Sequence, residues 1–309
     1  MIEVQGLTRR FGELTAVDRL SFEVRKGELF GLVGPDGAGK TTTLRMLAGV
    51  LRPTGGDATL AGLSVVRQPE AVKHRLAYMS QRFGLYADLT VLENLAFYAD
   101  LYRVPRSERP ARLERLFQFS NLEPFKDRLA GKLSGGMKQK LGLSCALIHQ
   151  PEILLLDEPT FGVDPVSRRE LWLIVHEMVA EGVTAVVSTA YMDEAERFDR
   201  LALLHRGRLL ALDAPGALQQ AMAAGGEEIL EVQVARARDA REHLAGLPDV
   251  RRVAVFGDRL HLSVGSAQRA ADEVTRALRA AGFEVLSARP IPPSLEDVFI
   301  GKVAEADAA

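Results

Sequence analysis

A glycine-rich segment near the N-terminus has the residue types of a phosphate-binding loop. It follows a compact apolar run at residues 29–33 and precedes a stretch of helical character. Gly37 and Gly39 let backbone amides approach phosphate oxygens without a Cβ in the way, and the following helix N-terminus adds partial positive charge. Lys40 can bridge the outer phosphates, and the Thr41 hydroxyl can bind Mg²⁺. The predicted loop residues are Gly34, Pro35, Asp36, Gly37, Ala38, Gly39, Lys40, Thr41 and Thr42.

Two consecutive carboxylates follow a second apolar run, at residues 153–156. Asp157 can hold Mg²⁺ at the end of this strand, directly or through a water molecule. Glu158 is the candidate for polarising the water that attacks the terminal phosphate. Two acids after a strand are by themselves a weak signal, often only a strand-end cap. Together with the glycine loop they predict an ATPase that uses ATP and Mg²⁺.

A third segment, residues 133–139, offers another anion site. Ser134 can cap a helix that runs to about Ile148, which is a purely structural role. Gly135 and Gly136 have no capping role of their own, and their amides next to Ser134 would form a second phosphate site at a helix start. Two such sites in one chain suggest that one completes the other in a neighbouring copy.

Alternating strands and helices must position these motifs. Residues 1–30 are expected to form short strands, residues 85–125 helices that begin at a Thr90–Glu93 capping box, and residues 185–188 and 201–204 further strands. Asp164 can cap a helix with an apolar stripe from Leu171 to Met178. This alternation predicts an α/β core with a largely parallel sheet.

The character of the chain changes near residue 215, where Pro215-Gly216 and Gly225-Gly226 flank a short alanine-rich helix. We therefore predict an ATPase domain at 1–215, a linker at 216–227 and a small accessory domain at 228–309. Its expected elements are strand 228–235, helix 238–246, strands 250–256 and 259–264, helix 267–281 and strand 283–289. This βαββαβ order is typical of an α+β ferredoxin-like domain.

Composition limits the classes of partner. Lys and Arg total 39 against 41 Asp and Glu in 309 residues, which argues against a dedicated nucleic-acid binder. Cys145 is the only cysteine, so no internal disulfide is expected, and a reducing cytosol and a core position are favoured. The N-terminus lacks the apolar stretch of a secretory signal, and no window approaches the roughly 20 apolar residues of a membrane helix. A membrane function would need another chain to span the bilayer.

The motifs together resemble those of the ATP-binding subunits of ABC (ATP-binding cassette) transporters, over roughly residues 1–215. Besides the phosphate loop and the acidic pair, the resemblance includes the signature Leu133–Gly136, Gln81 and Asp164. It implies an ABC-type phosphate-loop NTPase fold with a RecA-like core, an antiparallel β subdomain and a helical subdomain. It also implies a head-to-tail dimer, in which each ATP lies between one subunit's phosphate loop and the other's Ser134, Gly135 and Gly136.

The resemblance implies roles for two further residues. Gln81 would sense Mg²⁺ and the attacking water and link them to the membrane partner, in a groove formed largely by residues 82–102. Phe11 stands where the family places an aromatic residue against adenine. A buried phenylalanine at a strand end is the alternative.

One position departs from the family pattern. Ala190 follows Ser188 and Thr189 where the family has a histidine, and a methyl group cannot donate a hydrogen bond to the γ-phosphate. His205 is expected on the next strand, facing solvent, and the direction of Tyr191 is open. The chain is most similar in its motifs to the first ATPase half of tandem bacterial multidrug exporters, where this histidine is also replaced. We therefore hypothesise a heterodimer with a second ATPase that retains it.

The function that the resemblance implies is ATP hydrolysis that powers a membrane exporter of drugs or other amphiphiles. The partners would be transmembrane permease subunits, at the cytoplasmic face of the cell membrane. One alternative is a weakly hydrolysing regulatory cassette, and another is an ATPase that remodels ribosomes or DNA. The C-terminal domain, with its ending Pro293–Phe299, resembles appendages of drug-exporter ATPases. Its charges, such as Arg251 and Arg252, are expected to be solvated, with a regulatory or dimer-clamping role as the alternative.

Overall fold

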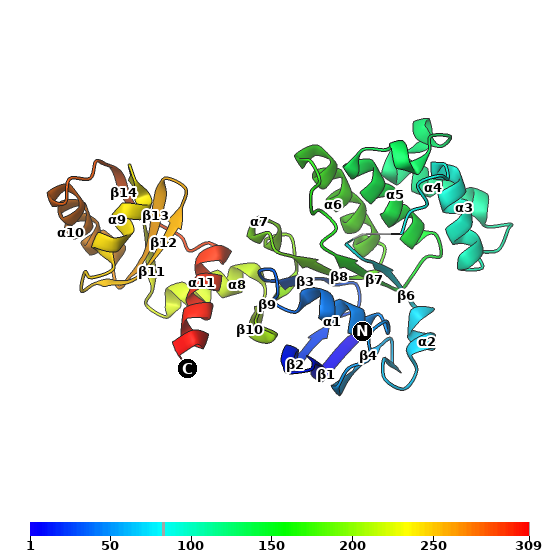
Figure 1. Cartoon of the computed structure of the whole chain (residues 1–309), viewed down its shortest axis with the longest axis horizontal. Coiled ribbons are helices and arrows are strands. Elements are labelled where there is room, and N and C mark those ends of the chain that lie inside the picture. The colour runs from blue at the N-terminus through cyan, green and yellow to red at the C-terminus, as the bar shows by residue number, and fades with distance from the viewer. Residues whose placement is uncertain (82–83, 309) are drawn as a thin grey trace. The chain divides into compact units, whose positions relative to one another are not determined.

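The computed structural model describes residues 1–81 and 84–308 and divides into two compact units, Met1–Leu209 and Leu210–Ala309 (Figure 1). The helix expected between the two glycine-containing pairs is present as α8 (Pro215–Ala224). The domain boundaries at 215 and 227 stay a prediction. None of the helices in the described part is long and apolar enough to cross a lipid bilayer.

The first unit begins with a four-stranded antiparallel sheet in the order β2-β1-β4-β5. The expectation of short strands is wrong, since β1 and β2 have ten and eleven residues. The pairing shifts at three places along β1, and such bulges interrupt the alternation of buried and exposed residues that marks a long strand. The strands are β1 (Ile2–Phe11), β2 (Leu14–Val24), β4 (Gly55–Leu60) and β5 (Leu63–Ser64).

A six-stranded sheet in the order β10-β9-β3-β8-β7-β6 includes the core of this unit, and its edge strand β10 continues past Leu209. The five strands from β9 to β6 are parallel, which confirms the predicted α/β core. Because β3, β8 and β7 are neighbours, their carboxyl ends share one edge, and that edge carries the glycine loop and the acidic pair. The strands are β3 (Leu29–Val33), β6 (Leu76–Met79), β7 (Ile153–Asp157), β8 (Thr184–Thr189), β9 (Arg200–His205) and β10 (Arg208–Asp213).

The predicted helix starts are confirmed. Thr90 and Glu93 form a reciprocal capping box, and the Ser134 and Asp164 side chains accept hydrogen bonds from the backbone amides of Met137 and Ser167. The helices are α1 (Lys40–Leu47), α2 (Pro69–Lys73), α3 (Val91–Leu101), α4 (Arg109–Ser120), α5 (Gly135–Leu147), α6 (Pro165–Ala180) and α7 (Met192–Ala195), with 3₁₀ turns at Glu123–Phe125 and Ala130–Lys132.

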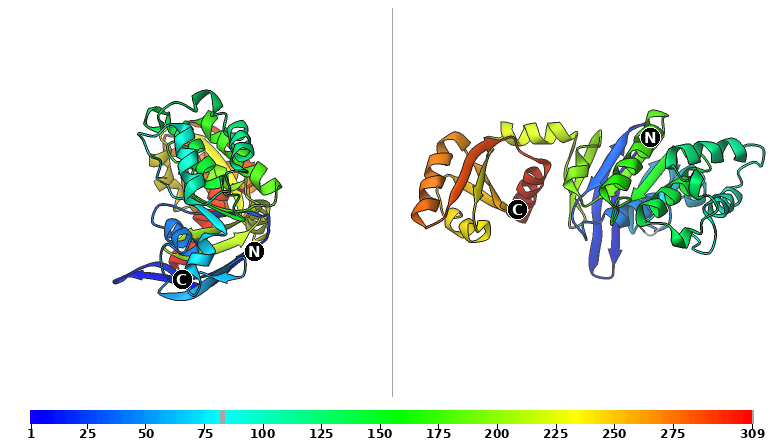
Figure 2. Two further views of the ribbon diagram at one scale, coloured as in Figure 1. Left: turned by 90° about the vertical axis from the view of Figure 1, so that its right-hand side faces the viewer. Right: turned by 90° about the horizontal axis from the view of Figure 1, so that it is seen from above.

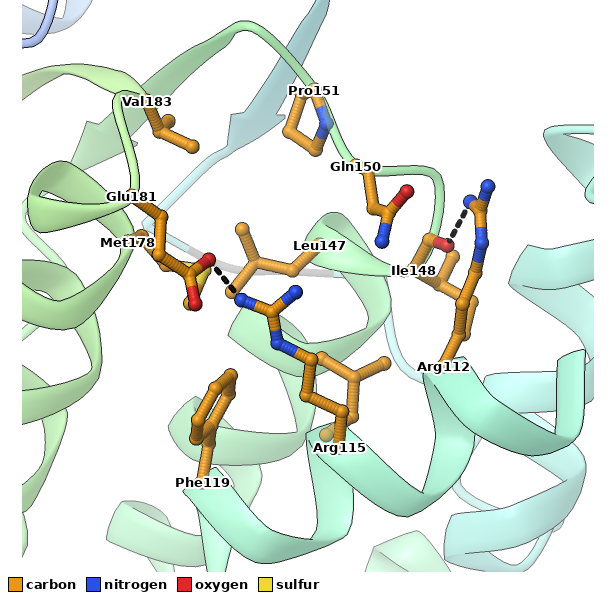
Figure 3. A pocket seen from close by; sticks show the side chains of 11 residues that line it. Arg112, Arg115, Phe119, Leu147, Ile148, Gln150, Pro151, Met178, Glu181 and Val183 are labelled. Carbon is orange, nitrogen blue, oxygen red and sulfur yellow. Dashed lines mark hydrogen bonds and ion pairs between the residues drawn. The ribbon is translucent and has the colours of Figure 1, made fainter. Parts of the chain in front are cut away.

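Helices α3, α4 and α5 gather beside the β6 edge of the parallel sheet (Figures 1 and 2). A cavity of about 200 Å³ lies where α4 meets α5 and α6. In Figure 3 the Arg115 guanidinium reaches Glu181 across this cavity, and Arg112 donates to the Ile148 carbonyl at 2.9 Å. These contacts hold α4 to both neighbours. Cys145 on α5 is fully buried, and burial raises the pKa of its thiol, so the expected core position is confirmed.

The second unit has the predicted βαββαβ order, and its sheet order β12-β13-β11-β14 with antiparallel pairing confirms the ferredoxin-like fold. Alternate residues of the central strand, Leu230, Val232 and Val234, pack with α9 and α10 in one apolar core. The elements are β11 (Glu228–Val234), α9 (Ala237–Leu244), β12 (Val250–Phe256), β13 (Arg259–Val264), α10 (Ala267–Ala280), β14 (Val285–Ile291) and α11 (Leu295–Ala308).

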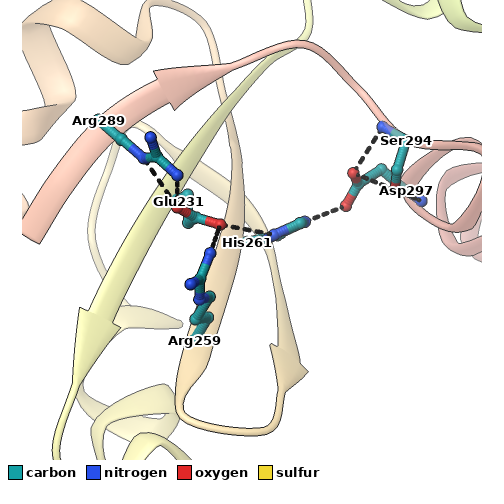
Figure 4. A network of polar contacts seen from close by, with 6 residues as sticks. All are labelled: Glu231, Arg259, His261, Arg289, Ser294 and Asp297. Carbon is teal, nitrogen blue, oxygen red and sulfur yellow. Dashed lines mark hydrogen bonds and ion pairs between the residues drawn. The ribbon is translucent and has the colours of Figure 1, made fainter.

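The opposite face of this sheet carries a network of charges (Figure 4). Buried Glu231 accepts hydrogen bonds from Arg259 at 2.8 Å and from Arg289 at 2.9 Å. On the neighbouring strand, His261 Nδ1 lies 2.9 Å from an oxygen of Asp297, at the start of α11. Arg259 and Arg289 are exposed, as expected for the charges of this domain. The expectation is wrong for Arg252, which pairs with Glu227, and for Glu231 and Asp297, which are buried. Pairing across strands permits their burial.

We expect Asp297→Asn to destabilise the second unit. Burial raises the pKa of Asp297, but hydrogen bonds from His261 and Ser294 outweigh it, and the folded pKa lies below its usual value. The carboxylate therefore adds stability above the unfolded pKa of about 4, and this stability is lost as pH falls through the folded pKa. The variant should lose about 1–3 kcal/mol of unfolding free energy at neutral pH in denaturant titrations. Exposed Asp272→Asn is the control, and an equal loss there would contradict the prediction.

Candidate active site

The glycine loop joins the end of β3 to the start of α1. Gly39 has a φ of +100°, and a Cβ there would lie 2.6 Å from the Ala16 carbonyl oxygen, so only glycine fits. The Gly34 amide donates to the Thr189 carbonyl at 3.2 Å, which fastens the loop to β8. Lys40 is buried, and its ammonium donates to the Gly34 carbonyl at 2.8 Å and the Pro35 carbonyl at 3.1 Å. Two carbonyl groups of the loop thus bind the ammonium of the lysine at its end.

Asp157 is buried at the end of β7 and is fully engaged. One of its oxygens accepts from the Thr41 hydroxyl at 2.9 Å and from the Ser188 hydroxyl at 2.8 Å, and the other accepts from the Tyr78 hydroxyl at 3.3 Å. Burial and the Asp157 charge raise the pKa of Tyr78 to about 12, so the phenol remains a donor at neutral pH. Ser188 and Tyr78 orient the carboxylate toward Thr41, a role that we did not predict for them.

Glu158 lies between two of the predicted catalytic side chains. Its carboxylate is 3.1 Å from the Lys40 ammonium and accepts a hydrogen bond from the Gln81 amide at 3.2 Å. Its backbone has a left-handed φ of +48°, which costs a non-glycine residue about 1–3 kcal/mol and is typical of functional sites. Two hydrogen bonds from its amide to Ser188 maintain this conformation. The structure therefore brings Lys40, Gln81 and Glu158 together.

The oxygens around Thr41 suit a magnesium ion. The Thr41 hydroxyl and the Asp157 carboxylate are hard ligands that already lie within hydrogen-bond distance of each other, so one small cation can bind both. Gln81 directs its amide nitrogen to Glu158. Its role as a metal ligand stays a prediction.

A cleft of about 720 Å³ opens above these groups. Phe11 lines it and is 45% exposed, so the alternative of a buried phenylalanine is excluded. Sequence motifs did not identify four of the lining residues, because these come from the β1–β2 hairpin and the β9–β10 turn. The described residues that line the cleft are Phe11, Leu14, Thr15, Ala16, Asp36, Gly37, Ala38, Gly39, Lys40, Thr41, Thr42, Gln81, Glu158 and Arg206.

The signature residues Ser134, Gly135 and Gly136 are not among those lining residues. A Cβ on Gly136 would lie 2.2 Å from the Ser167 hydroxyl oxygen, so this glycine lets α5 pack closely against α6. That packing role was missed in the sequence. The nearest atom to a Cβ on Gly135 would be 3.9 Å away, so position 135 has no such constraint.

The residues on either side of Ala190, in the segment after β8, make contacts with buried Glu194 and with helix α6. Thr189 donates to buried Glu194 at 2.7 Å, and the Tyr191 ring stacks under the Arg168 guanidinium of α6 at 4.7 Å. The Tyr191 side chain is thereby held at α6. The expectation that His205 faces solvent is wrong for its ring nitrogens, because both are shielded from solvent, although the residue as a whole is only partly buried.

Known proteins that resemble this chain in sequence include ATP-binding proteins of ABC transporters. Residues 17–161 match the family model of ABC transporters, and residues 216–303 match that of the C-terminal domain of DrrA1-3-like ATP-binding proteins. The chain is 44% identical to the probable multidrug ABC transporter ATP-binding protein YbhF of Escherichia coli K12 over 302 residues, which are 97% of this chain and 51% of that protein. The chain thus spans about half the length of this relative.

Other relatives match along nearly their whole length. The Nod factor export ATP-binding protein I of Paraburkholderia xenovorans is 37% identical, over 97% of this chain and 95% of its own. The daunorubicin resistance protein DrrA2 of Streptomyces coeruleorubidus is 36% identical, over 97% and 94%. A solved ATP-binding subunit of an ABC transporter superposes with a TM-score of 0.66 at 30% identity, over 72% of this chain and 93% of that one. The chain belongs to the family of ATP-binding proteins of ABC transporters.

Proposed function

We propose that this chain binds and hydrolyses MgATP and that hydrolysis powers export through a membrane partner. The observation that carries the proposal is the position of Glu158, 3.1 Å from the Lys40 ammonium at a cleft that also contains the Thr41–Asp157 oxygen pair. Relatives named for multidrug transport, Nod factor export and daunorubicin resistance support the transport part.

Lys40 supplies the positive charge for the outer phosphates. Its ammonium is bound by two loop carbonyls and by Glu158, all of which are acceptors that phosphate oxygens can replace. Exchange of Glu158 for phosphate would free that carboxylate to accept a proton from water. Gln81 donates to the other Glu158 oxygen and would keep the carboxylate directed into the cleft.

Asp157 and Thr41 would hold the magnesium ion that accompanies ATP. Held by these two residues, the ion would supply positive charge to offset the negative charge that develops on the transferred phosphate. Ser188 and Tyr78 orient Asp157 by donating to both of its oxygens. The backbone of Glu158 is fixed by the same serine, so one residue aligns the metal ligand and the group that activates water.

A second subunit would complete the cleft. Ser134, Gly135 and Gly136 form a helix start that does not line the cleft of their own chain, which supports binding of a partner's nucleotide there. A solved bacterial ABC transporter cassette that superposes with a TM-score of 0.63 at 25% identity is dimeric. We propose a nucleotide-sandwich dimer, formed with a second ATPase that retains the histidine absent at Ala190.

The membrane part would be supplied by transmembrane permease subunits at the cytoplasmic face of the membrane. Of the segment 82–102 predicted to receive them, residues 82 and 83 lie outside the described part, and Tyr86 and Leu101 are 47% and 58% exposed. Purified chain should bind MgATP and should hydrolyse it faster when vesicles carry the permease and the second ATPase. Absence of MgATP binding would overturn the proposal.

We expect Ala190→His to raise a slow ATPase rate and to leave MgATP binding unchanged. A well-placed donor to the transferred phosphate is worth about 10²–10³ in rate, and Ala190 cannot donate through its side chain. Phosphate release by the purified chain is the measurement, with Ala190→Gln, an uncharged amide donor, as the matched variant. An unchanged rate in both would mean either that another residue already fills the role or that this site is not the hydrolytic one. The latter favours the second candidate function, a regulatory cassette.

A further inference from the structure

Two exposed apolar side chains form the tip of the β1–β2 hairpin. Phe11 and Leu14 face each other as cross-strand partners, and both line the nucleotide cleft. They remain 45% and 67% exposed. Flat aromatic rings prefer to stack on such surfaces, so the hairpin tip offers a platform for the base of a nucleotide.

Arg9 covers one face of the Phe11 ring. Its guanidinium carbon lies 4.4 Å from the ring centroid, within the range of a cation–π contact. The same guanidinium donates through Nη1 to the Arg52 carbonyl at 2.8 Å. Arg9 is half-buried, and its Nε is shielded from solvent. The guanidinium is therefore fixed on one side by the backbone and on the other by the ring.

The carbonyl that anchors Arg9 belongs to the segment that follows α1. This segment is bound to β1 on both sides of Arg9, because Thr54 donates to the Thr8 carbonyl at 2.8 Å and accepts from the Arg10 amide at 3.2 Å. Helix α1 begins at Lys40, in the phosphate loop. The contacts of Arg9 thus connect the base platform to the element that binds the phosphates.

We propose that Arg9 is a positioning residue for the base of ATP. By covering one face of Phe11 and holding to the Arg52 carbonyl, it fixes the ring so that the opposite face receives the purine. An aromatic side chain at a hairpin tip would otherwise lose rotational freedom when ligand binds, and prior fixation removes that cost. The inference rests on the proposed function, since it requires ATP in this cleft.

The test compares two ligands that share their phosphates. We expect Arg9→Gln to raise the Kd of MgATP about 3- to 10-fold, in line with a cation–π contact, and to leave the Kd of magnesium triphosphate unchanged. Arg10→Gln removes the same charge from the next residue, which is exposed and lies outside the cleft lining, and should change neither Kd. Isothermal calorimetry gives all the values, and thermal unfolding of each variant checks that it folds.

A double-mutant cycle separates positioning from a general effect of charge. In the Phe11→Ala background, Arg9→Gln should have no further effect on MgATP binding. An equal effect in both backgrounds, or an equal loss for triphosphate, would overturn the positioning role. So would an unchanged Kd for Arg9→Gln while the wild type binds MgATP. If the wild type does not bind MgATP, the proposed function itself fails, and the role of Arg9 with it.

Discussion

Glu158→Gln should abolish turnover while MgATP remains bound. The amide keeps the size of the side chain and its contact with Gln81, but it cannot accept a proton from water. Loss of general-base catalysis typically costs about 10²–10⁴ in rate. The pair with Lys40 is also weakened, so the ammonium is freer to bind phosphate. We therefore expect a long-lived nucleotide-bound dimer.

Single-turnover phosphate release and size-exclusion chromatography with MgATP measure the two parts of this result. The complex to use is the one that shows the highest wild-type rate, whether the chain alone or the chain with its second ATPase. Glu196→Gln is the matched control, because that glutamate is exposed on the segment after α7. Wild-type turnover in Glu158→Gln would assign water activation to another residue.

Lys40→Ala should remove most of the affinity for MgATP. The ammonium is the only buried cation that lines the cleft among the described residues, and charge-assisted hydrogen bonds to phosphate are worth about 1.5–3 kcal/mol each. Loss of one to two of them corresponds to about 10- to 10⁴-fold in Kd. Titration with a fluorescent ATP analogue measures this change.

The control for this variant is Lys26→Ala, in the exposed turn before β3. It removes an equal charge from the same unit and should leave the Kd unchanged. Removal of Lys40 also deprives Glu158 of its ion-pair partner, so the variant needs a measurement of thermal unfolding beside the titration. Tight MgATP binding by a folded Lys40→Ala variant would contradict the role of this lysine.

The parts of the site that sequence motifs predicted are those with local causes. The loop from Gly34 to Thr42 and the caps at Ser134 and Asp164 depend on neighbours within a few residues, so short patterns define them. The parallel core and the βαββαβ domain follow from the order of strands and helices. Each of these predictions follows from residues that are close together in the sequence or from the order of elements along it.

The site residues that sequence motifs did not identify depend on contacts between segments that are distant in the sequence. Arg206 and Leu14 enter the cleft because a turn and a hairpin meet there, and neither has a motif. Ser188 aligns Asp157 from a neighbouring strand, 31 residues away. The shielding of the His205 ring nitrogens is likewise a property of the folded chain that periodicity does not reveal. Such roles become visible only when the register of the sheet is known.

The close contact of Gly136 with Ser167 has a mechanical consequence. Ser167 also donates its amide to Asp164, six residues after Glu158, so this serine contacts both the helix that begins after Ser134 and the segment that follows Glu158. If Ser134 binds the partner's nucleotide, a movement of Glu158 during hydrolysis would be transmitted through Ser167 to the helix start that binds that nucleotide. In a dimer of two such chains, hydrolysis at one site would then change the affinity of the other site for its nucleotide.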